Sequence, residues 1–230
     1  MNGALLYLFD IDGTLLLAHG SGKAAFDAVF HATHGIADGS AGIRYGGKTD
    51  PAIIDELYNA RLGRSATTEE HAAFLADYLP RLQLMLDAQG VAVLAGVVEA
   101  LAFLQTQPDV ILGIGTGNVV EGAAKKLEAA NLHAYFVLGG YGSDSRVRGE
   151  LVGKGIERGR ALAGERGIRE VIVVGDTIHD ISAARACGAT VCAVATGSDT
   201  ADALSHADVV FATLHELPAW HKARFGSCNL

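Results

Sequence analysis

Short hydrophobic runs recur along the chain, and longer segments with a helical spacing of apolar residues separate them. The runs are rich in aliphatic and β-branched side chains, which predicts strands buried on both faces. The predicted strands cover residues 4–9, 109–116, 135–138, 171–175, 190–194 and 208–211. Strands that alternate with helices form parallel sheets with right-handed crossovers, so the sequence predicts an α/β fold with a doubly wound parallel sheet. Ligands of such sheets bind at the carboxyl ends of the strands.

The segment between the first two predicted strands is too long for a single crossover. Its apolar spacing predicts three helices, over residues 23–34, 51–61 and 68–86. Asp50-Pro51 suits a first helical turn, and Thr67-Thr68-Glu69-Glu70 resembles an N-terminal cap with acids near the helix dipole. We therefore predict a core of residues 1–16 and 95–230 with an inserted α-helical cap domain of residues 17–94. An insert above the carboxyl edge of the sheet is expected to act as a lid.

Composition narrows the class of protein. The chain has 230 residues, 50% of them hydrophobic, and a formal net charge of −8 without long basic runs, so nothing favours nucleic acid or an anionic membrane as a partner. No apolar stretch approaches the roughly 20 residues that span a bilayer, and we expect no signal peptide. Cys187, Cys192 and Cys228 lack metal-ligand spacing, which predicts reduced thiols and a cytoplasmic location. We expect a monomer or a homodimer.

The first predicted strand leads into Asp10-Ile11-Asp12-Gly13-Thr14. Two carboxylates spaced by two residues lie on one side of an extended segment, and Gly13 allows a sharp turn directly after them. Such a pair repels unless a cation lies nearby, and Mg²⁺ suits oxygen ligands. An ordinary turn is the simpler interpretation, because Asp and Gly are common in turns. A calcium-binding loop is excluded, because Ser21 stands where its twelfth position needs a Glu.

Two further strand ends carry polar residues. Thr116-Gly117-Asn118 follows the second predicted strand and offers a hydroxyl and free backbone N–H groups to an anion. The alternative for Thr116 is a simple helix cap. Asp176 follows the fourth predicted strand, and Asp180 comes one helical turn later. A third carboxylate at this edge suggests a metal site, in which Asp180 acts from the second shell or is simply an acid at a helix start.

In this combination the chain resembles the haloacid dehalogenase superfamily, whose members carry Asp-x-Asp-Gly-Thr, a strand-end Thr or Ser, a basic residue and Gly-Asp-x-x-x-Asp in this order. The resemblance implies that Asp10 is a nucleophile forming an aspartyl-phosphate, and that Asp12 is the general acid and base. It implies that Thr116 holds the phosphoryl group, and that Asp10, the carbonyl of Asp12 and Asp176 bind Mg²⁺. The insert resembles the helical cap of the phosphoglycolate-phosphatase-like and β-phosphoglucomutase-like branch.

The basic residue of the family pattern has three candidates, Arg146, Arg148 and Lys154, because the frequent Lys-Pro pair is missing. The cation is expected at the start of the helix before the fourth motif, where it stabilises Asp10 and the transferring phosphoryl group. We favour Arg148, since Lys154 falls well inside a predicted helix and long cations on helices are commonly solvated.

The segment Gly46-Gly47-Lys48-Thr49-Asp50 has two interpretations. Residues 42–49 match the phosphate-binding loop of nucleoside triphosphatases, but the segment before them is a poor strand, which that loop requires. In the resembling family the equivalent segment is a cap loop that selects substrate. Lys48 is then a candidate ligand for a second anionic group of the substrate, and a solvated lysine is the alternative.

The resemblance implies a Mg²⁺-dependent phosphatase that hydrolyses a small phosphorylated metabolite, with phosphoglycolate or a sugar phosphate as examples. Asp12 favours phosphate ester hydrolysis, because dehalogenating and phosphonate-cleaving relatives lack an acid at this position. Two alternatives stay open: a phosphomutase of the β-phosphoglucomutase type, and a non-catalytic protein of the same fold that binds a metabolite.

Overall fold

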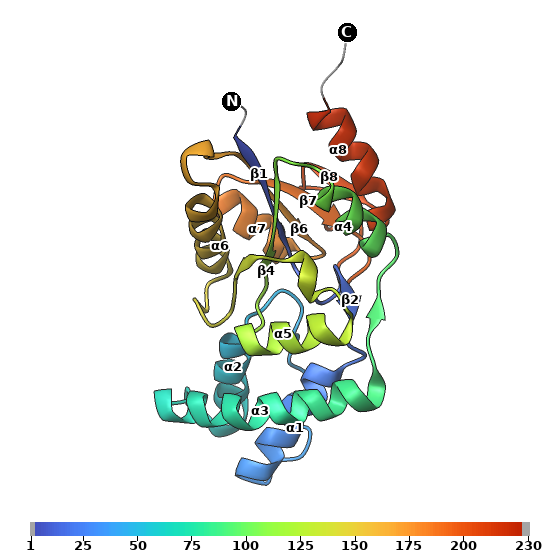
Figure 1. Cartoon of the computed structure of the whole chain (residues 1–230). Helices are drawn as coiled ribbons and strands as arrows, with labels where there is room; N and C mark the ends of the chain where they lie inside the picture. The colour runs from blue at the N-terminus through green and yellow to red at the C-terminus, as the bar shows by residue number, and fades with distance from the viewer. Residues whose placement is uncertain (1–2, 227–230) are drawn as a thin grey trace.

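The computed structural model describes residues 3–226 and contains a six-stranded parallel sheet (Figure 1). The strand order is β5-β4-β1-β6-β7-β8. The strands are β1 (Ala4–Phe9), β4 (Val110–Gly115), β5 (Leu138–Gly140), β6 (Ile168–Gly175), β7 (Thr190–Val194) and β8 (Val209–Phe211). All residues of β1 are buried, as its uninterrupted apolar sequence requires at the centre of a parallel sheet. Cys228 lies outside the described residues.

Helices cover both faces of the sheet. Tyr7 and Phe9 of β1 belong to a buried cluster that includes residues of α4 (Val97–Gln105), α5 (Val120–Ala129) and α8 (Leu217–Phe225). Leu6 and Leu8 belong to a second cluster that includes residues of α6 (Arg148–Ala163) and α7 (Ile178–Ala186). Successive side chains of a strand point to opposite faces, so the two clusters follow directly from the strand period. The predicted doubly wound α/β fold is confirmed.

The helical insert lies at the carboxyl edge of the sheet (Figure 1). It comprises α1 (Ser21–His34), α2 (Asp50–Leu62) and α3 (Thr68–Gln89), each within a few residues of its predicted range. A two-stranded antiparallel ribbon of β2 (Leu16–Leu17) and β3 (Ala92–Val93) connects the insert to the sheet. Helix α5 of the core packs against α3, so it lies between the sheet and the insert.

Helix α3 begins as its sequence predicts. The Thr67 hydroxyl accepts from the Glu70 backbone N–H, and the Glu70 carboxylate accepts from the Thr67 N–H, which completes a capping box. Pro80 lies inside the helix, and Gly90 follows its end. Within residues 3–226, neither α3 nor any other helix combines the length and the apolar character needed to cross a membrane.

One strand was predicted at the wrong place. Residues 135–138 were expected to be extended, but a short 3-10 helix, η1, covers His133–Tyr135, and β5 starts only at Leu138. The backbone of Gly140 lies so close to α6 that a side chain at Gly140 would collide with the Leu151 carbonyl. The edge strand therefore contains glycines, which have low strand propensity. A prediction that relies on runs of β-branched residues does not detect such a strand.

Candidate active site

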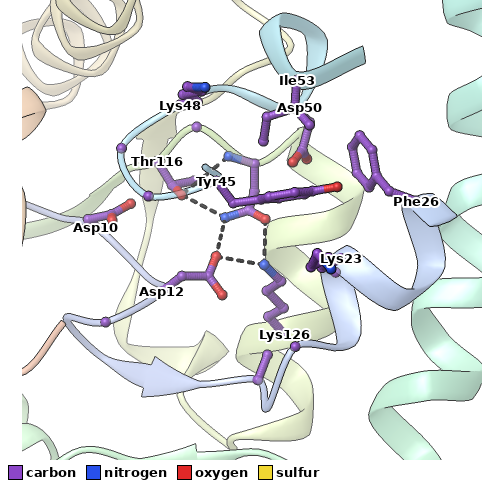
Figure 2. A pocket seen from close by; sticks show the side chains of 18 of the residues that line it. Asp10, Asp12, Lys23, Phe26, Tyr45, Lys48, Asp50, Ile53, Thr116 and Lys126 are labelled. Atoms are coloured by element: carbon purple, nitrogen blue, oxygen red, sulfur yellow. Dashed lines mark hydrogen bonds and ion pairs between the residues drawn. The ribbon is translucent and has the colours of Figure 1, made fainter. Parts of the chain in front are cut away.

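The carboxyl ends of three neighbouring strands bring the predicted residues together. Asp10 follows β1, Thr116 follows β4 and Asp176 follows β6, and the sheet order places β1 between the other two. A cavity of about 540 Å³ lies between this edge and the helical insert (Figure 2). It is lined by Asp10, Asp12, Thr116, Gly117, Asn118 and Arg148 on the core side.

Asp10, Asp176 and Asp180 form a cluster of buried acids, each offering a carboxylate oxygen within 4.8 Å of the others. Burial raises the pKa of Asp176 to about 8, and the charges of Asp10 and Asp180 add to the shift. Burial likewise raises the pKa of Asp10 to about 6, although Arg148 opposes the shift. Oxygen donors of high charge density fit a hard divalent cation such as Mg²⁺, which would relieve the repulsion among these carboxylates.

The Asp176 carboxylate is held in place by hydrogen bonds from two other segments, one after β1 and one after β7. The Thr14 hydroxyl donates to Oδ1 at 3.0 Å, and the Ser198 backbone N–H donates to Oδ2 at 3.2 Å. Gly13 has a φ of +87°, and a Cβ added there would lie 2.5 Å from Asp176 Oδ2. Glycine is therefore required at this position for both its backbone conformation and its lack of a side chain.

Arg148 is the cation that lies against Asp10. It occupies the first position of α6, and its Nη2 atom is 2.9 Å from Asp10 Oδ1 and 2.6 Å from Asp180 Oδ1. Burial lowers the pKa of Arg148, but the charges of Asp10 and Asp180 outweigh this and hold the pKa above its ordinary value. The other carboxylate oxygen of Asp180 accepts from the backbone and hydroxyl of Thr177, so this residue anchors Arg148 to the start of α7.

The two other candidate cations lie elsewhere. Arg146 reaches into the helical insert, where its Nε is 3.2 Å from Asp55 Oδ2 and its Nη2 is 3.1 Å from the His71 ring. Lys154 is exposed on α6 and pairs with Glu157 at 2.8 Å. Of the three basic residues considered from the sequence, Arg148 is the one that lines the cavity.

The Thr116–Asn118 segment connects the core side of the cavity to the insert. Thr116 Oγ1 accepts from the Asn118 backbone N–H at 3.3 Å and from its side-chain Nδ2 at 2.9 Å. The Gly117 carbonyl accepts from the Asp50 N–H at 2.8 Å, and a side chain at Gly117 would collide with the Lys48 carbonyl. The loop therefore packs tightly beneath the residues that open α2.

Lys126 is a site residue that sequence reasoning missed. Its Nζ donates to Asp12 Oδ2 at 2.6 Å and to Asn118 Oδ1 at 2.7 Å, and its side chain is only 6% exposed. A lysine on a helix usually faces solvent. The signal lies in the helical period of α5, because Lys126 shares the buried face with Ala123 and Leu127 and is the charged member of that stripe.

The family is decided by the sequence match. A model of haloacid dehalogenase-like hydrolases matches residues 5–188, which span the acids, Thr116, Lys126 and Arg148. The chain belongs to this family. A search among curated proteins gave no match.

Solved structures share the fold of this haloacid dehalogenase-like hydrolase at low identity. CbbY from Rhodobacter sphaeroides in complex with phosphate is 16% identical with a TM-score of 0.71, covering 93% of this chain and 96% of that one. A predicted phosphoglycolate phosphatase from Haemophilus somnus is 18% identical with a TM-score of 0.69, covering 96% and 98%. A candidate beta-phosphoglucomutase from Bacteroides vulgatus is 16% identical with a TM-score of 0.69, covering 98% and 90%.

The insert of this haloacid dehalogenase-like hydrolase supplies the other side of the cavity wall. Its apolar and aromatic lining side chains include those of Leu17, Phe26, Ile43, Tyr45, Ile53 and Tyr78. Lys48 also lines the cavity, but its Nζ donates to Glu56 of α2, and its predicted contact with a substrate anion stays a prediction. No strand lies within residues 35–49, so the loop at 42–49 lacks the element that precedes a nucleotide-binding loop.

Proposed function

We propose that this hydrolase is a Mg²⁺-dependent phosphatase that acts on a small phosphorylated metabolite through an aspartyl-phosphate on Asp10. One observation carries the proposal: Asp10 and Asp12 leave the same strand end but enter different surroundings. Asp10 lies with Arg148 and the buried acids, whereas Asp12 lies outside that cluster and bonds to Asn118 and Lys126. Two carboxylates in unlike environments are suited to different roles, one as nucleophile and one as acid and base.

The proposed chemistry has two steps. A carboxylate oxygen of Asp10 attacks phosphorus while the bond to the leaving oxygen breaks, and that oxygen takes a proton from Asp12. Water then attacks the phosphorus of the aspartyl-phosphate and gives a proton to Asp12, and cleavage of the bond to Asp10 releases inorganic phosphate. The Arg148 guanidinium lies 2.9 Å from Asp10 and would bind the oxygens of the phosphoryl group. It would stabilise the negative charge on these oxygens during the transfer. Thr116 and the N–H groups of Gly117 and Asn118 would hold the same group.

Magnesium fits the residues present. We propose that Asp10, the carbonyl of Asp12 and Asp176 hold the ion, while Asp180 supports the site by orienting Arg148. When bound, the ion supplies positive charge that offsets repulsion between the carboxylates and an incoming phosphate. The raised pKa values of Asp10 and Asp176 support this assignment. They indicate that the charge of Arg148 does not compensate the burial of these carboxylates, so a further cation would stabilise their ionised forms.

The substrate class is proposed from the cavity and the relatives. A cavity of about 540 Å³ suits a small metabolite, and similar structures include a phosphate complex and a predicted phosphoglycolate phosphatase. A phosphomutase is the second candidate, favoured by the similar fold of a candidate beta-phosphoglucomutase. A non-catalytic binding protein is the least supported alternative, because binding alone does not require the acid Asp12. The free thiols of Cys187 and Cys192 support a cytoplasmic location, and we keep a monomer or homodimer as the expected state.

The test is release of inorganic phosphate from a panel of small phosphomonoesters, with Mg²⁺ and with chelator, for wild type and Asp10→Asn. We expect metal-dependent release that the substitution abolishes, while the circular dichroism spectrum stays unchanged. Conversion of a sugar phosphate without phosphate release would favour the mutase. If the protein bound phosphoesters but neither released phosphate nor converted a sugar phosphate, the non-catalytic alternative would be favoured.

A further inference from the structure

A second buried cation lies in the active site beside Arg148. Lys126 extends from α5 to the cavity, where it reaches the Asp12 carboxylate (Figure 2). Its Nζ lies 2.6 Å from Asp12 Oδ2 and 2.7 Å from Asn118 Oδ1. The Asn118 Nδ2 atom donates to the same Asp12 oxygen at 2.8 Å, which closes a ring of three side chains. The ring joins the end of β1 to the loop and helix that follow β4.

The two cations serve different acids. Arg148 bonds to Asp10 and Asp180, and among residues 3–226 the ion pair of Asp12 is the one with Lys126. The Lys126 side chain is 6% exposed, and the insert lies beside the ammonium, since a Cβ added at Gly22 of α1 would lie 3.9 Å from Nζ. An ammonium removed from water is costly unless a carboxylate and hydrogen bonds compensate it, and Asp12 with Asn118 provides both.

The bonds to Asp12 distinguish its two oxygens. Oδ2 accepts from both Lys126 and Asn118, whereas Oδ1 accepts from no group within residues 3–226. A carboxyl group whose one oxygen is fixed by two donors has a defined orientation, and its other oxygen is left to carry the proton. An ammonium at 2.6 Å also stabilises the carboxylate that remains after that proton has left.

We propose that Lys126 is a positioning residue for Asp12 that orients the carboxyl group and stabilises its anion when the leaving oxygen is protonated. The inference rests on the proposed phosphatase function, in which Asp12 gives its proton to that oxygen. Its consequence depends on the leaving group. An alkoxide needs the proton when the bond to phosphorus breaks, whereas a nitrophenolate leaves without it. Loss of Lys126 therefore slows phosphoryl transfer from alkyl phosphates and spares transfer from nitrophenyl phosphate.

The experiment compares Lys126→Met with the neighbouring control Lys125→Met. Lys125 also lies on α5, but it donates to Gln83 of the insert at 3.2 Å and not to the site. With an alkyl phosphate such as glycerol phosphate, we expect kcat of Lys126→Met to fall roughly 30- to 100-fold, which is less than the roughly 10²- to 10⁴-fold contribution of a general acid because Asp12 itself remains. With p-nitrophenyl phosphate, the first burst of nitrophenolate should stay within about threefold of wild type, since that step needs no acid. Lys125→Met should behave as wild type with both.

A double-mutant cycle supplies a second readout. If Lys126 acts through Asp12, the double variant Asp12→Asn, Lys126→Met should turn over no more slowly than Asp12→Asn alone. Because the Lys126 side chain is buried and its replacement disturbs the packing around it, Lys126→Gln, which keeps a donor without the charge, replaces Lys126→Met if the latter does not fold. Equal losses with both classes of substrate, a rise in KM with unchanged kcat, or additive losses in the cycle would overturn the inference. Failure of wild type to hydrolyse any phosphomonoester would instead reject the proposed function.

Discussion

At the scale of single residues, the site depends on close contacts that a short sequence motif encodes. Gly13 follows the two acids, has a φ of +87°, and leaves room for the Asp176 carboxylate from another strand. Thr14, the next residue, donates to that same carboxylate at 3.0 Å. The motif therefore supplies the acids at the end of β1 and also the surface against which the third acid packs.

Replacement of Gly13 tests this contact. In Gly13→Ala the new Cβ would lie 2.5 Å from Asp176 Oδ2, so the carboxylate must move. We expect stability to fall by about 1–3 kcal/mol from the strained backbone. A displacement of about 1 Å at such a site lowers kcat on the order of 100-fold. The measurements are urea unfolding and steady-state phosphatase kinetics.

The matched control is Gly35→Ala. Gly35 ends α1 with a φ of +70°, but no atom lies within 4 Å of an added Cβ. The control should lose stability through backbone strain alone and keep its kcat. If Gly13→Ala kept full activity at a similar loss of stability, the contact with Asp176 would have no part in the arrangement of the site.

Lys126 marks the limit of residue-level prediction. The positions of Asp10, Asp12 and Asp176 follow from their places at strand ends, because parallel strands present their carboxyl ends along one edge. The place of Lys126 depends instead on how α5 is rotated against the sheet and on the insert that buries it. The charged residue on a buried helical stripe was a detectable signal, but its partner Asp12 is 114 residues away in sequence.

At the scale of elements, a residue from the insert completes a helix of the core. Helix α5 has no side-chain cap of its own at Val119. The Asp50 carboxylate, from the start of α2, accepts from the Val119 backbone N–H at 2.8 Å. An acid at a helix N-terminus satisfies a free N–H group and interacts favourably with the dipole. The sequence indicated Asp50 only as the residue before Pro51 at the start of its own helix, and its contact with Val119 depends on how the insert lies against the core.

Asp50 makes stability depend on pH. Burial raises its pKa from 3.8 to about 6, although Lys126 and the Val119 N–H oppose the shift. The folded state therefore holds the proton more tightly than the unfolded chain. The stabilisation that the folded state gains by binding this proton on Asp50 is fully present below the unfolded pKa of 3.8. It is lost as the pH rises through the folded pKa of about 6. We expect Asp50→Asn, which does not titrate, to gain up to about 3 kcal/mol relative to wild type across this window.

Urea unfolding of both proteins at several pH values between 4 and 7 measures this difference. Asp202→Asn, which removes an exposed carboxylate of the core, is the control and should not reproduce the gain expected of Asp50→Asn. A difference between Asp50→Asn and wild type that stays constant over the window would contradict the assignment of the titration to Asp50.

The edge of the sheet shows where element prediction fails. Strands β1, β4, β6, β7 and β8 were predicted because their apolar runs are buried, and the helices because their apolar spacing and caps are regular. Strand β5 consists of Leu138, Gly139 and Gly140, and its glycines reflect the close approach of α6. Such a close approach between elements distant in sequence arises only in the packed fold. The local strand propensity of residues 138–140 therefore does not predict it.

At the scale of the whole molecule, the insert and one face of the sheet share a hydrophobic core. Tyr7 and Phe9 of β1 belong to the same buried cluster as Phe26, Tyr58 and Tyr78 of the insert. Polar contacts add to it, among them Arg146 with Asp55 and Asp50 with Val119. The acid cluster lies at the base of this interface, so binding at the site acts on the stability of the molecule as a whole.

Binding of Mg²⁺ should therefore stabilise the fold. Without a cation, burial holds the pKa of Asp176 at about 8, so the carboxylate opposes folding at neutral pH. At a Mg²⁺ concentration of about 100 times Kd, we expect a gain of about 2.7 kcal/mol, which corresponds to a rise in Tm of roughly 5–10 °C for a chain of this size. Thermal unfolding in Mg²⁺ and in chelator measures it.

Asp176→Asn separates binding at the site from a general effect of salt. Because the substitution removes a buried carboxylate with a raised pKa, the variant should have a higher Tm than wild type in chelator. Because it also removes a proposed ligand, its Tm should not respond to Mg²⁺. Asp202→Asn should keep the wild-type response. An equal rise in Tm for Asp176→Asn and wild type would mean that Mg²⁺ binds elsewhere, and a lower Tm for Asp176→Asn in chelator would mean that the acid cluster stabilises the fold without a metal.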